Sequence, residues 1–428
     1  MQPARRGETA AYVIVTCLFF AWGFITSLID PLVAAVKGIF SLSDVEAQLS
    51  ASAFFIAYGV MSFPAAVLLA RRKAVPTVLI ALAMMVGGCL LMLFAANIAE
   101  YPLVLLGLFV LASGITILQV AANPLAAALG RPEQSHFRLT FSQSFNSLGT
   151  FIGPFLGSVL FLKGIEVKQG TVITEAARTG SLAGIDRAFF WIAGLIILVA
   201  ALIWVGRKVI SAAAPPPPVE TSRKGIVTTF REAISSRWAL FGGAAIFLYV
   251  GAEVSIGTQM ALFLNSDNVW GIPLQDAGKM VSLYWGGAMV GRLIGSVLLT
   301  RVPAPKLLAV FTGMASAMCL YVFAVGGVSA GYVALAIGLF NSIMFPVIFT
   351  ITLERSTASA EATSGFLCFS IIGGAAIPPI VGFVSGHSNY VTAFIVPALC
   401  YAVLCSFALA ARNARVRLRD EPAAATIH

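Results

Sequence analysis

The sequence predicts an all-α membrane protein with twelve transmembrane helices in two six-helix halves. Its mean hydropathy is +0.93, and 59% of its 428 residues are hydrophobic. Only 11% are charged, whereas a soluble domain carries roughly 25% charged residues. Apolar runs of about 20 residues recur along the chain, and each can cross the roughly 30 Å hydrocarbon core as a helix. Helices are expected because lipid cannot satisfy an unpaired backbone amide.

The apolar runs divide into two sets of six. The first set is expected at 10–36, 48–70, 75–97, 101–127, 139–163 and 187–206. The second set is expected at 237–264, 277–300, 305–326, 330–352, 363–385 and 391–411. Between them, basic residues flank the proline run Pro215 to Pro218, which predicts an extended or amphipathic linker. We therefore predict an N-terminal half at 1–206, a cytoplasmic linker at 207–236 and a C-terminal half at 237–428.

Short sequence patterns recur in the two halves, in the same order and at a nearly constant offset. The matched pairs are 19–23 with 247–251, 68–71 with 298–301, 107–109 with 338–340, and Gly149-x4-Pro154-x2-Gly157 with Gly374-x4-Pro379-x2-Gly382. A six-plus-six repeat joined by a basic linker is typical of the major facilitator fold. In that fold the substrate site lies near the membrane midplane, between the halves.

The distribution of Lys and Arg predicts the orientation. Most of the 27 basic residues fall in the termini and in the loops after even-numbered spans. The exceptions are Lys37, Lys163, Lys168, Arg178, Arg187 and Lys279 in the opposite loops, and Arg292 within a span. Because basic loops stay in the cytoplasm, we expect both termini there and the chain in a bacterial inner membrane. The net charge of +9 is thus explained by membrane topology, and no nucleic-acid partner is expected.

The sequence lacks the residue clusters that metal or cofactor chemistry requires. The six cysteines lie in apolar stretches without a CxxC pair, and His136, His387 and His428 are widely separated. No glycine-rich phosphate loop occurs. A membrane-embedded enzyme would need a nucleophile, a metal or an acid–base cluster. We therefore predict no enzyme activity, no metal and no cofactor, and we expect a monomer.

Asp30 and Glu253 are the acidic residues that lie well within predicted spans, at related places in the first and seventh. An ionisable group at mid-bilayer costs about 2.5–3.5 kcal/mol, so each needs a reason to be there. Asp30 precedes Pro31 and is predicted to face a cavity, where a carboxylate can load and release a proton. Glu253 has two interpretations, a second proton-coupling group or an ion-pair partner of Arg292.

Polar side chains follow one side of three helices in the first half. Trp22, Thr26 and Asp30 are spaced i, i+4, i+8, and an aromatic face beside a carboxylate suits a sugar ring. The fourth span carries Ser113, Thr116, Gln119 and Asn123, and the fifth carries Gln143, Asn146 and Thr150. These stripes either bind substrate hydroxyls or hold helices together; unpaired amides are costly in lipid, which favours binding. The second half offers Asn341, with Tyr284, Trp285 and Phe345 as apolar contacts.

The chain resembles the fucose/glucose/galactose:proton symporter family of the major facilitator superfamily. The resemblance covers nearly the whole chain and is most specific at 119–124 (QVAANP), 136–149 (HFRLTFSQSFNSLG), 250–257 (VGAEVSIG) and 371–374 (IIGG). It implies a sugar–cation symporter that works by alternating access. It also implies that Asp30 is the proton-coupling carboxylate and that Gln143 and Asn146 contact sugar.

Two departures from the family pattern bear on the sugar. Members that resemble the fucose permease have a carboxylate where this chain has Gln119, whereas glucose/galactose-type members have Gln. Ile29 stands where the family commonly has Asn before the aspartate. We therefore predict import of a hexose such as glucose or galactose, with an amino sugar or fucose as alternatives. An efflux carrier of the same fold, a sodium-coupled symporter and a membrane sensor remain further alternatives.

Overall fold

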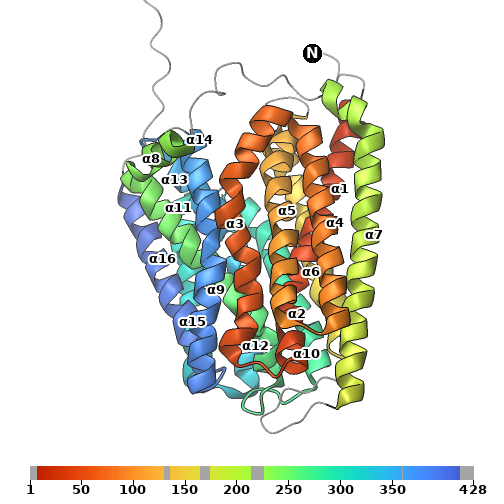
Figure 1. Ribbon diagram of the computed structural model, residues 1–428. Coiled ribbons are helices and arrows are strands. Elements are labelled where there is room, and N and C mark those ends of the chain that lie inside the picture. The colour runs from red at the N-terminus through yellow and green to blue at the C-terminus, as the bar shows by residue number, and fades with distance from the viewer. Residues whose placement is uncertain are drawn as a thin grey trace, which may run out of the picture.

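The computed structural model describes residues 7–129, 135–163, 174–213, 226–299, 301–358 and 360–414. Within these ranges the regular structure is helical, and long helices run roughly side by side between two ends of the molecule (Figure 1). The short helices α8 (Ile226–Ile234) and α14 (Ala360–Phe369) lie close together at one end of the molecule (Figure 1).

The described residues of the first half form seven helices, because the first span is broken. They are α1 (Glu8–Ser27), α2 (Ile29–Ile39), α3 (Asp44–Arg72), α4 (Ala74–Ile98), α5 (Tyr101–Ala128), α6 (Ser135–Phe161) and α7 (Glu175–Ala213). The break between α1 and α2 falls at Leu28, so Pro31 lies in the first turn of α2. A proline is tolerated there because the first backbone N–H groups of a helix have no intrahelical partner.

The second half follows α8, and two of its spans are interrupted. Its helices are α9 (Arg237–Asn265), α10 (Leu274–Leu299), α11 (Ala304–Val325), α12 (Gly327–Asn341), α13 (Met344–Arg355), α14, η3 (Ser370–Ile372), α15 (Gly373–His387), η4 (Thr392–Phe394) and α16 (Ile395–Asn413). Helices α12 and α13 form one span with a break at Ser342–Ile343, and α14, η3 and α15 follow one another to form the next.

Twelve helical segments of the described chain are long and apolar enough to cross a membrane, which confirms the predicted fold class. The sixth differs most from the prediction. It runs from Arg178 to Ala213 instead of 187–206, because α7 continues through charged residues at both ends. Arg178 and Arg187 therefore lie in a helix and not in the predicted loop. Residues 214–225 of the predicted linker lie outside the described residues. On either side of them the linker is helical, in the last turns of α7 and in α8.

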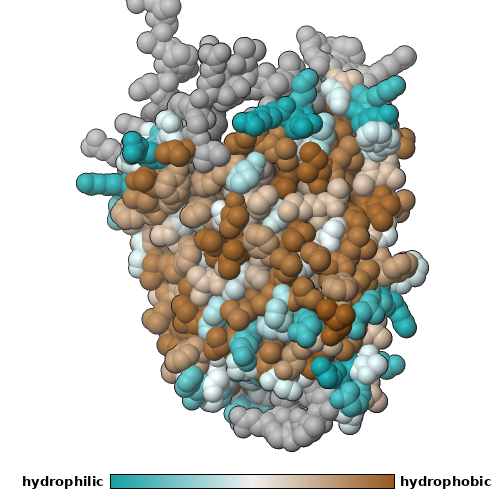
Figure 2. Space-filling model, viewed as in Figure 1, coloured by the Kyte–Doolittle hydropathy of each residue, from teal (hydrophilic) through white to brown (hydrophobic). Residues whose placement is uncertain are grey.

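The surface carries an apolar belt of the kind that faces lipid. Figure 2 shows hydrophobic residues covering the middle of the visible face, with most hydrophilic residues toward its two ends. Large apolar side chains such as Trp191 and Val205 are 68% and 77% exposed. In a soluble protein such an extensive apolar surface would promote aggregation, whereas in a bilayer it is the surface that lipid requires.

The most extensive contacts between the halves are those of α3 with α15, α6 with α10, and α2 with α9. Close approach within each half depends on glycine. A Cβ atom at Gly373 would lie 1.9 Å from the carbonyl oxygen of Phe247, and one at Gly149 would lie 2.5 Å from that of Phe20. At both positions the absence of a side chain allows the helices to pack closely.

Candidate substrate and proton site

Asp30 lies between the two halves, two residues after the break at Leu28 in the first span. Its side chain is 4% exposed, and its Oδ2 accepts a hydrogen bond from Trp285 Nε1 of α10 at 2.5 Å. Helix α9 passes close by at Gly257, where a Cβ atom would lie 3.2 Å from Asp30 Oδ1. The sequence predicted Asp30 and Trp285 as site residues, and the structure brings these two side chains into direct contact across the interface.

A small cavity adjoins this contact. It is lined by residues of both halves, namely Thr26, Ser27, Ile29, Asp30, Phe55, Thr150, Val254, Thr258 and Trp285. Its volume is about 40 Å³, far below the roughly 300–1,000 Å³ of a typical ligand pocket. The buried hydroxyl of Thr26 has no hydrogen-bond partner among the residues that the structure describes. A cavity of this size is too small for a sugar, so the surrounding side chains must move apart before a sugar can bind here.

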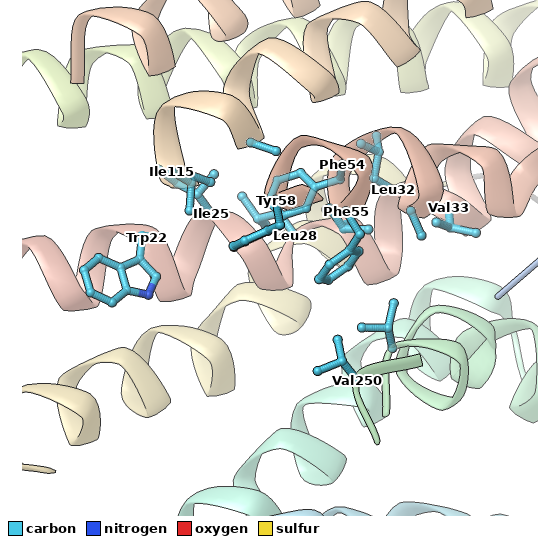
Figure 3. Close-up of a cluster of buried hydrophobic side chains, with 14 of the residues drawn as sticks. Trp22, Ile25, Leu28, Leu32, Val33, Phe54, Phe55, Tyr58, Ile115 and Val250 are labelled. Carbon is cyan, nitrogen blue, oxygen red and sulfur yellow. The ribbon is translucent and has the colours of Figure 1, made fainter. Parts of the chain in front are cut away.

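The aromatic side chains around the break come mainly from α3. Figure 3 shows Phe55 and Tyr58 beside Leu28, with Val250 of α9 across from them. Trp22 is 4% exposed and packs against Phe19, with ring centroids 4.2 Å apart. Trp22 therefore belongs to the buried apolar cluster near the cavity, whereas Thr26 and Asp30 of the same predicted stripe line the cavity itself.

The predicted amides of the fourth and fifth spans interact with one another and with neighbouring helices. Gln119 Nε2 donates to the Tyr58 hydroxyl at 2.8 Å, and Gln143 Nε2 donates to Asn123 Oδ1 at 3.4 Å. Asn146 Nδ2 donates to the Phe19 carbonyl oxygen at 3.2 Å. Each of these bonds uses one N–H and leaves further capacity on the amide for a ligand.

The hydroxyl groups on the same two helices have different surroundings. Ser113 and Thr116 are buried and bond to the backbone of their own helix, at 2.7 Å to Phe109 O and 2.9 Å to Ala112 O. These two hydroxyls are therefore satisfied without a ligand. Thr150 lines the cavity although its hydroxyl also donates within α6.

Asn341 and Glu253 lie in a network of tyrosines inside the second half. Asn341 is fully buried and its Nδ2 donates to the Tyr284 hydroxyl at 2.6 Å, while Tyr284 donates to the backbone oxygen of Glu253 at 3.2 Å. Tyr249 donates to the Asn341 carbonyl oxygen at 3.3 Å. Asn341 is absent from the residues that line the described cavity. Its buried Oδ1 has no hydrogen-bond partner among the described residues, and the predicted sugar contact stays a prediction.

Arg292 reaches from α10 into the first half. Its Nη1 donates to Ser147 Oγ of α6 at 2.5 Å, one turn from Gln143. It is also close enough to Glu253 to interact with it electrostatically, as the ion-pair interpretation expected. Glu253 in turn is close enough to Asp30 for their charges to interact. Arg292 is therefore more than a neutralising partner, since it connects Glu253 with the amide-bearing helix α6.

Several residues near the site were missed by sequence reasoning. Thr258 lines the cavity and donates to Gln48 Oε1 of α3 at 2.9 Å. Ser52 of α3 donates to the Ala375 carbonyl oxygen of α15 at 2.7 Å. Gln48 is an amide inside a predicted span, which is the signal that singled out Gln119. Its contact with Thr258 depends on how the halves pack, so no local sequence pattern could predict it.

Possible metal ligands do not cluster in the part of the chain that the structure describes. No group of three or more His, Cys, Asp or Glu side chains gathers there in a way that could hold an ion. The six cysteines are free thiols within or beside apolar packing. The cavity offers a buried carboxylate, hydroxyl groups and aromatic surface at the junction of the two halves, and the predicted amides of α5 and α6 are not among the residues that line it.

Comparison with known proteins agrees with this architecture. The model of the Major Facilitator Superfamily matches residues 12–366, and the chain belongs to that family. It is therefore a membrane transporter rather than an enzyme. The expected resemblance is confirmed at the level of the family.

Individual relatives match over almost their full length. A protein of Brucella abortus named glucose/galactose transporter is 38% identical, with 93% of each chain covered. The L-fucose-proton symporter of Escherichia coli is 30% identical, with 94% of each chain covered. Among solved structures, the transporter FucP in the outward conformation matches with a TM-score of 0.70 and 28% identity, covering 95% of this chain and 99% of that one.

Proposed function

We propose that this protein imports a hexose such as glucose or galactose by proton-coupled symport and alternating access. The observation that carries the proposal is the Asp30–Trp285 contact, a buried carboxylate of one half bonded to an indole N–H of the other at 2.5 Å. The names of the relatives, a glucose/galactose transporter and a fucose–proton symporter, support a sugar as substrate and a proton as coupling ion.

Asp30 can link protonation to movement of the halves. When the carboxylate is ionised, its bond to Trp285 is charge-assisted and roughly twice as strong as a neutral one. A proton on Asp30 removes that charge and weakens the contact across the interface. The proton therefore changes the balance between closed and separated halves, which is what coupling requires.

Sugar binding is proposed for the amides of α5 and α6 together with the aromatic surface of Phe55 and Trp285. Amides supply both donors and acceptors, as sugar hydroxyls require, and aromatic faces stack on the C–H face of a pyranose. Gln119 in place of a carboxylate favours an aldohexose or an amino sugar over fucose. Trp285 can contact the sugar, since it lines the cavity, and it responds to the proton on Asp30, since it bonds to that carboxylate.

The topology belongs to the same proposal. We propose both termini in the cytoplasm of a bacterial inner membrane, halves at 1–206 and 237–428, and a monomeric transport unit. The distribution of Lys and Arg supports the orientation. Under this orientation the α2–α3 turn faces the periplasm.

The test is uptake into proteoliposomes of radiolabelled glucose, galactose, fucose and N-acetylglucosamine, with pH and sodium gradients imposed separately. The proposal expects accumulation of glucose or galactose driven by an inwardly directed proton gradient. Accumulation of only fucose or N-acetylglucosamine would replace the proposed sugar. Accumulation driven by sodium alone would contradict proton coupling, and outward pumping of amphiphiles without sugar uptake would favour the efflux carrier.

A further inference from the structure

A cluster of polar side chains closes one end of the interface between the halves. Lys37 at the end of α2 forms an ion pair with Asp44 at the start of α3. The Asp44 carboxylate also accepts hydrogen bonds from the Tyr390 hydroxyl at 2.9 Å and from Ser385 Oγ at 3.0 Å. Lys37 Nζ lies 2.5 Å from the Tyr390 oxygen, to which it donates. The Asp44 carboxylate is thus bonded by Lys37 of its own half and by Ser385 and Tyr390 of the other half.

This cluster is largely shielded from water. The side chains of Lys37 and Asp44 are 14% and 9% exposed. Desolvating an ion pair is costly unless further hydrogen bonds satisfy its remaining donors and acceptors. Here the hydroxyls of Ser385 and Tyr390 supply those bonds, and both hydroxyls belong to the second half. The favourable arrangement of the pair therefore exists only while the halves are together at this end.

Contacts between the two halves occupy the space between this cluster and the cavity. Gln259 of α9 donates to Ser385 Oγ at 3.0 Å. At Gly382 of α15 a Cβ atom would lie 2.8 Å from the Asp44 carbonyl oxygen, so the backbones of α3 and α15 touch. One turn further along α3, Gln48 accepts from Thr258, which lines the cavity. A continuous set of contacts between the halves runs from the cluster to the cavity wall.

We propose that Lys37, Asp44, Ser385 and Tyr390 form a latch that holds the cavity shut toward the α2–α3 end of the protein. The bonds from Ser385 and Tyr390 to Asp44 are made in the closed arrangement and are lost when α3 and α15 separate. They therefore favour the closed state over the state open at this end, by the difference in their contacts. The assignment of a latch rests on the proposed alternating access, and the side of the membrane rests on the proposed orientation.

The test measures access to the cavity directly. All six cysteines are replaced by serine, and Val254→Cys then places a single reporter thiol in the cavity lining. The reagent is a maleimide that does not cross membranes. It is added to cells whose outer membrane has been made permeable and whose inner membrane is intact. Asp44→Asn removes the charge that organises the latch. Since each lost bond to a charged group biases the equilibrium by about tenfold or more, we expect labelling at least ten times faster than in the parent. Tyr390→Phe and Ser385→Ala each remove one of the two bonds that the second half makes to Asp44, and each should accelerate labelling less.

A matched control is available on the same proposed face. Asp276 and Lys279 of α10 form an ion pair at 2.7 Å that lies within the second half and is 52% and 30% exposed at its two side chains. Asp276→Asn makes the same chemical change without touching the interface, and it should leave the labelling rate unaltered. Gel filtration of each purified variant establishes that it is folded.

The outcomes separate the latch from the function on which it rests. Unchanged labelling in folded Asp44→Asn and Tyr390→Phe would overturn the latch, whatever sugar is carried. Faster labelling only in inside-out vesicles would support the latch and contradict the proposed orientation. Equal acceleration by Asp276→Asn would show a general effect of surface charge and would also overturn the proposal.

Discussion

Gln119 offers a test of where the sugar binds, because the structure gives its amide one protein partner and leaves it further hydrogen-bonding capacity. Its Nε2 donates to the Tyr58 hydroxyl at 2.8 Å, and Tyr58 stacks with Phe55, which lines the cavity. If the free acceptor and the second N–H serve sugar hydroxyls, Gln119→Ala leaves those hydroxyls unpaired in a desolvated site. The loss is about 1–3 kcal/mol, or roughly 5- to 150-fold in affinity.

A second variant distinguishes a direct contact from an indirect one. Tyr58→Phe removes only the protein partner of Gln119 and keeps the ring. A direct role for Gln119 predicts that Tyr58→Phe weakens binding far less than Gln119→Ala. If Gln119 merely holds Tyr58 in place, the two variants should weaken binding equally. Thr116→Val is the control, since that hydroxyl bonds within its own helix and should change affinity less than about twofold.

The assay is binding of labelled hexose to purified protein across a range of pH. An amide does not titrate in this range, so Gln119→Ala should lower affinity without moving the midpoint of the pH dependence. Gln119→Glu adds a titrating group and should alter the pH profile. Sugar binding by Gln119→Ala as tight as that of the parent would refute the reasoning and place the sugar away from this side of α5.

Three further predictions follow from the site and the topology. Trp285→Phe keeps an aromatic side chain, although a smaller one, and removes the N–H that bonds to Asp30, so proton-driven accumulation should fall while hexose counterflow continues; equal loss of both would indicate a purely structural role. Glu253→Gln should reduce accumulation with little loss of expression if the carboxylate couples protons, whereas loss of folded protein would support the ion-pair interpretation. Reporter fusions at Ala213 and Val167 should report cytoplasm and periplasm respectively, and a periplasmic Ala213 would refute the twelve-span orientation.

The sequence was sufficient for the number of spans because hydropathy is a property of each segment alone. It was insufficient where charged residues extend a helix beyond the apolar core, as in α7, which begins at Glu175 and ends at Ala213. Charges near a helix end reach the membrane surface on long side chains, so they do not mark where the helix stops.

For the site, sequence reasoning identified individual residues better than their partners. Asp30 was singled out because a carboxylate within a span is rare, and the structure places it between the halves. Its bond to Trp285 joins segments 255 residues apart and depends on how two halves pack. Asn341 is a similar case. An amide within a span suggested a ligand contact, which stays a prediction, and its bond to the Tyr284 hydroxyl inside the second half could not be foreseen from the sequence.

The most direct test of the account is sugar-induced proton uptake by the parent protein and by Asp30→Asn. Hexose is added to energy-depleted cells that express each protein, and the pH of the weakly buffered medium is recorded. The parent should make the medium alkaline as sugar and protons enter together. Asp30→Asn should give no alkalinisation while hexose counterflow in proteoliposomes partly survives. Normal alkalinisation by folded Asp30→Asn would contradict the central claim that this carboxylate carries the coupled proton.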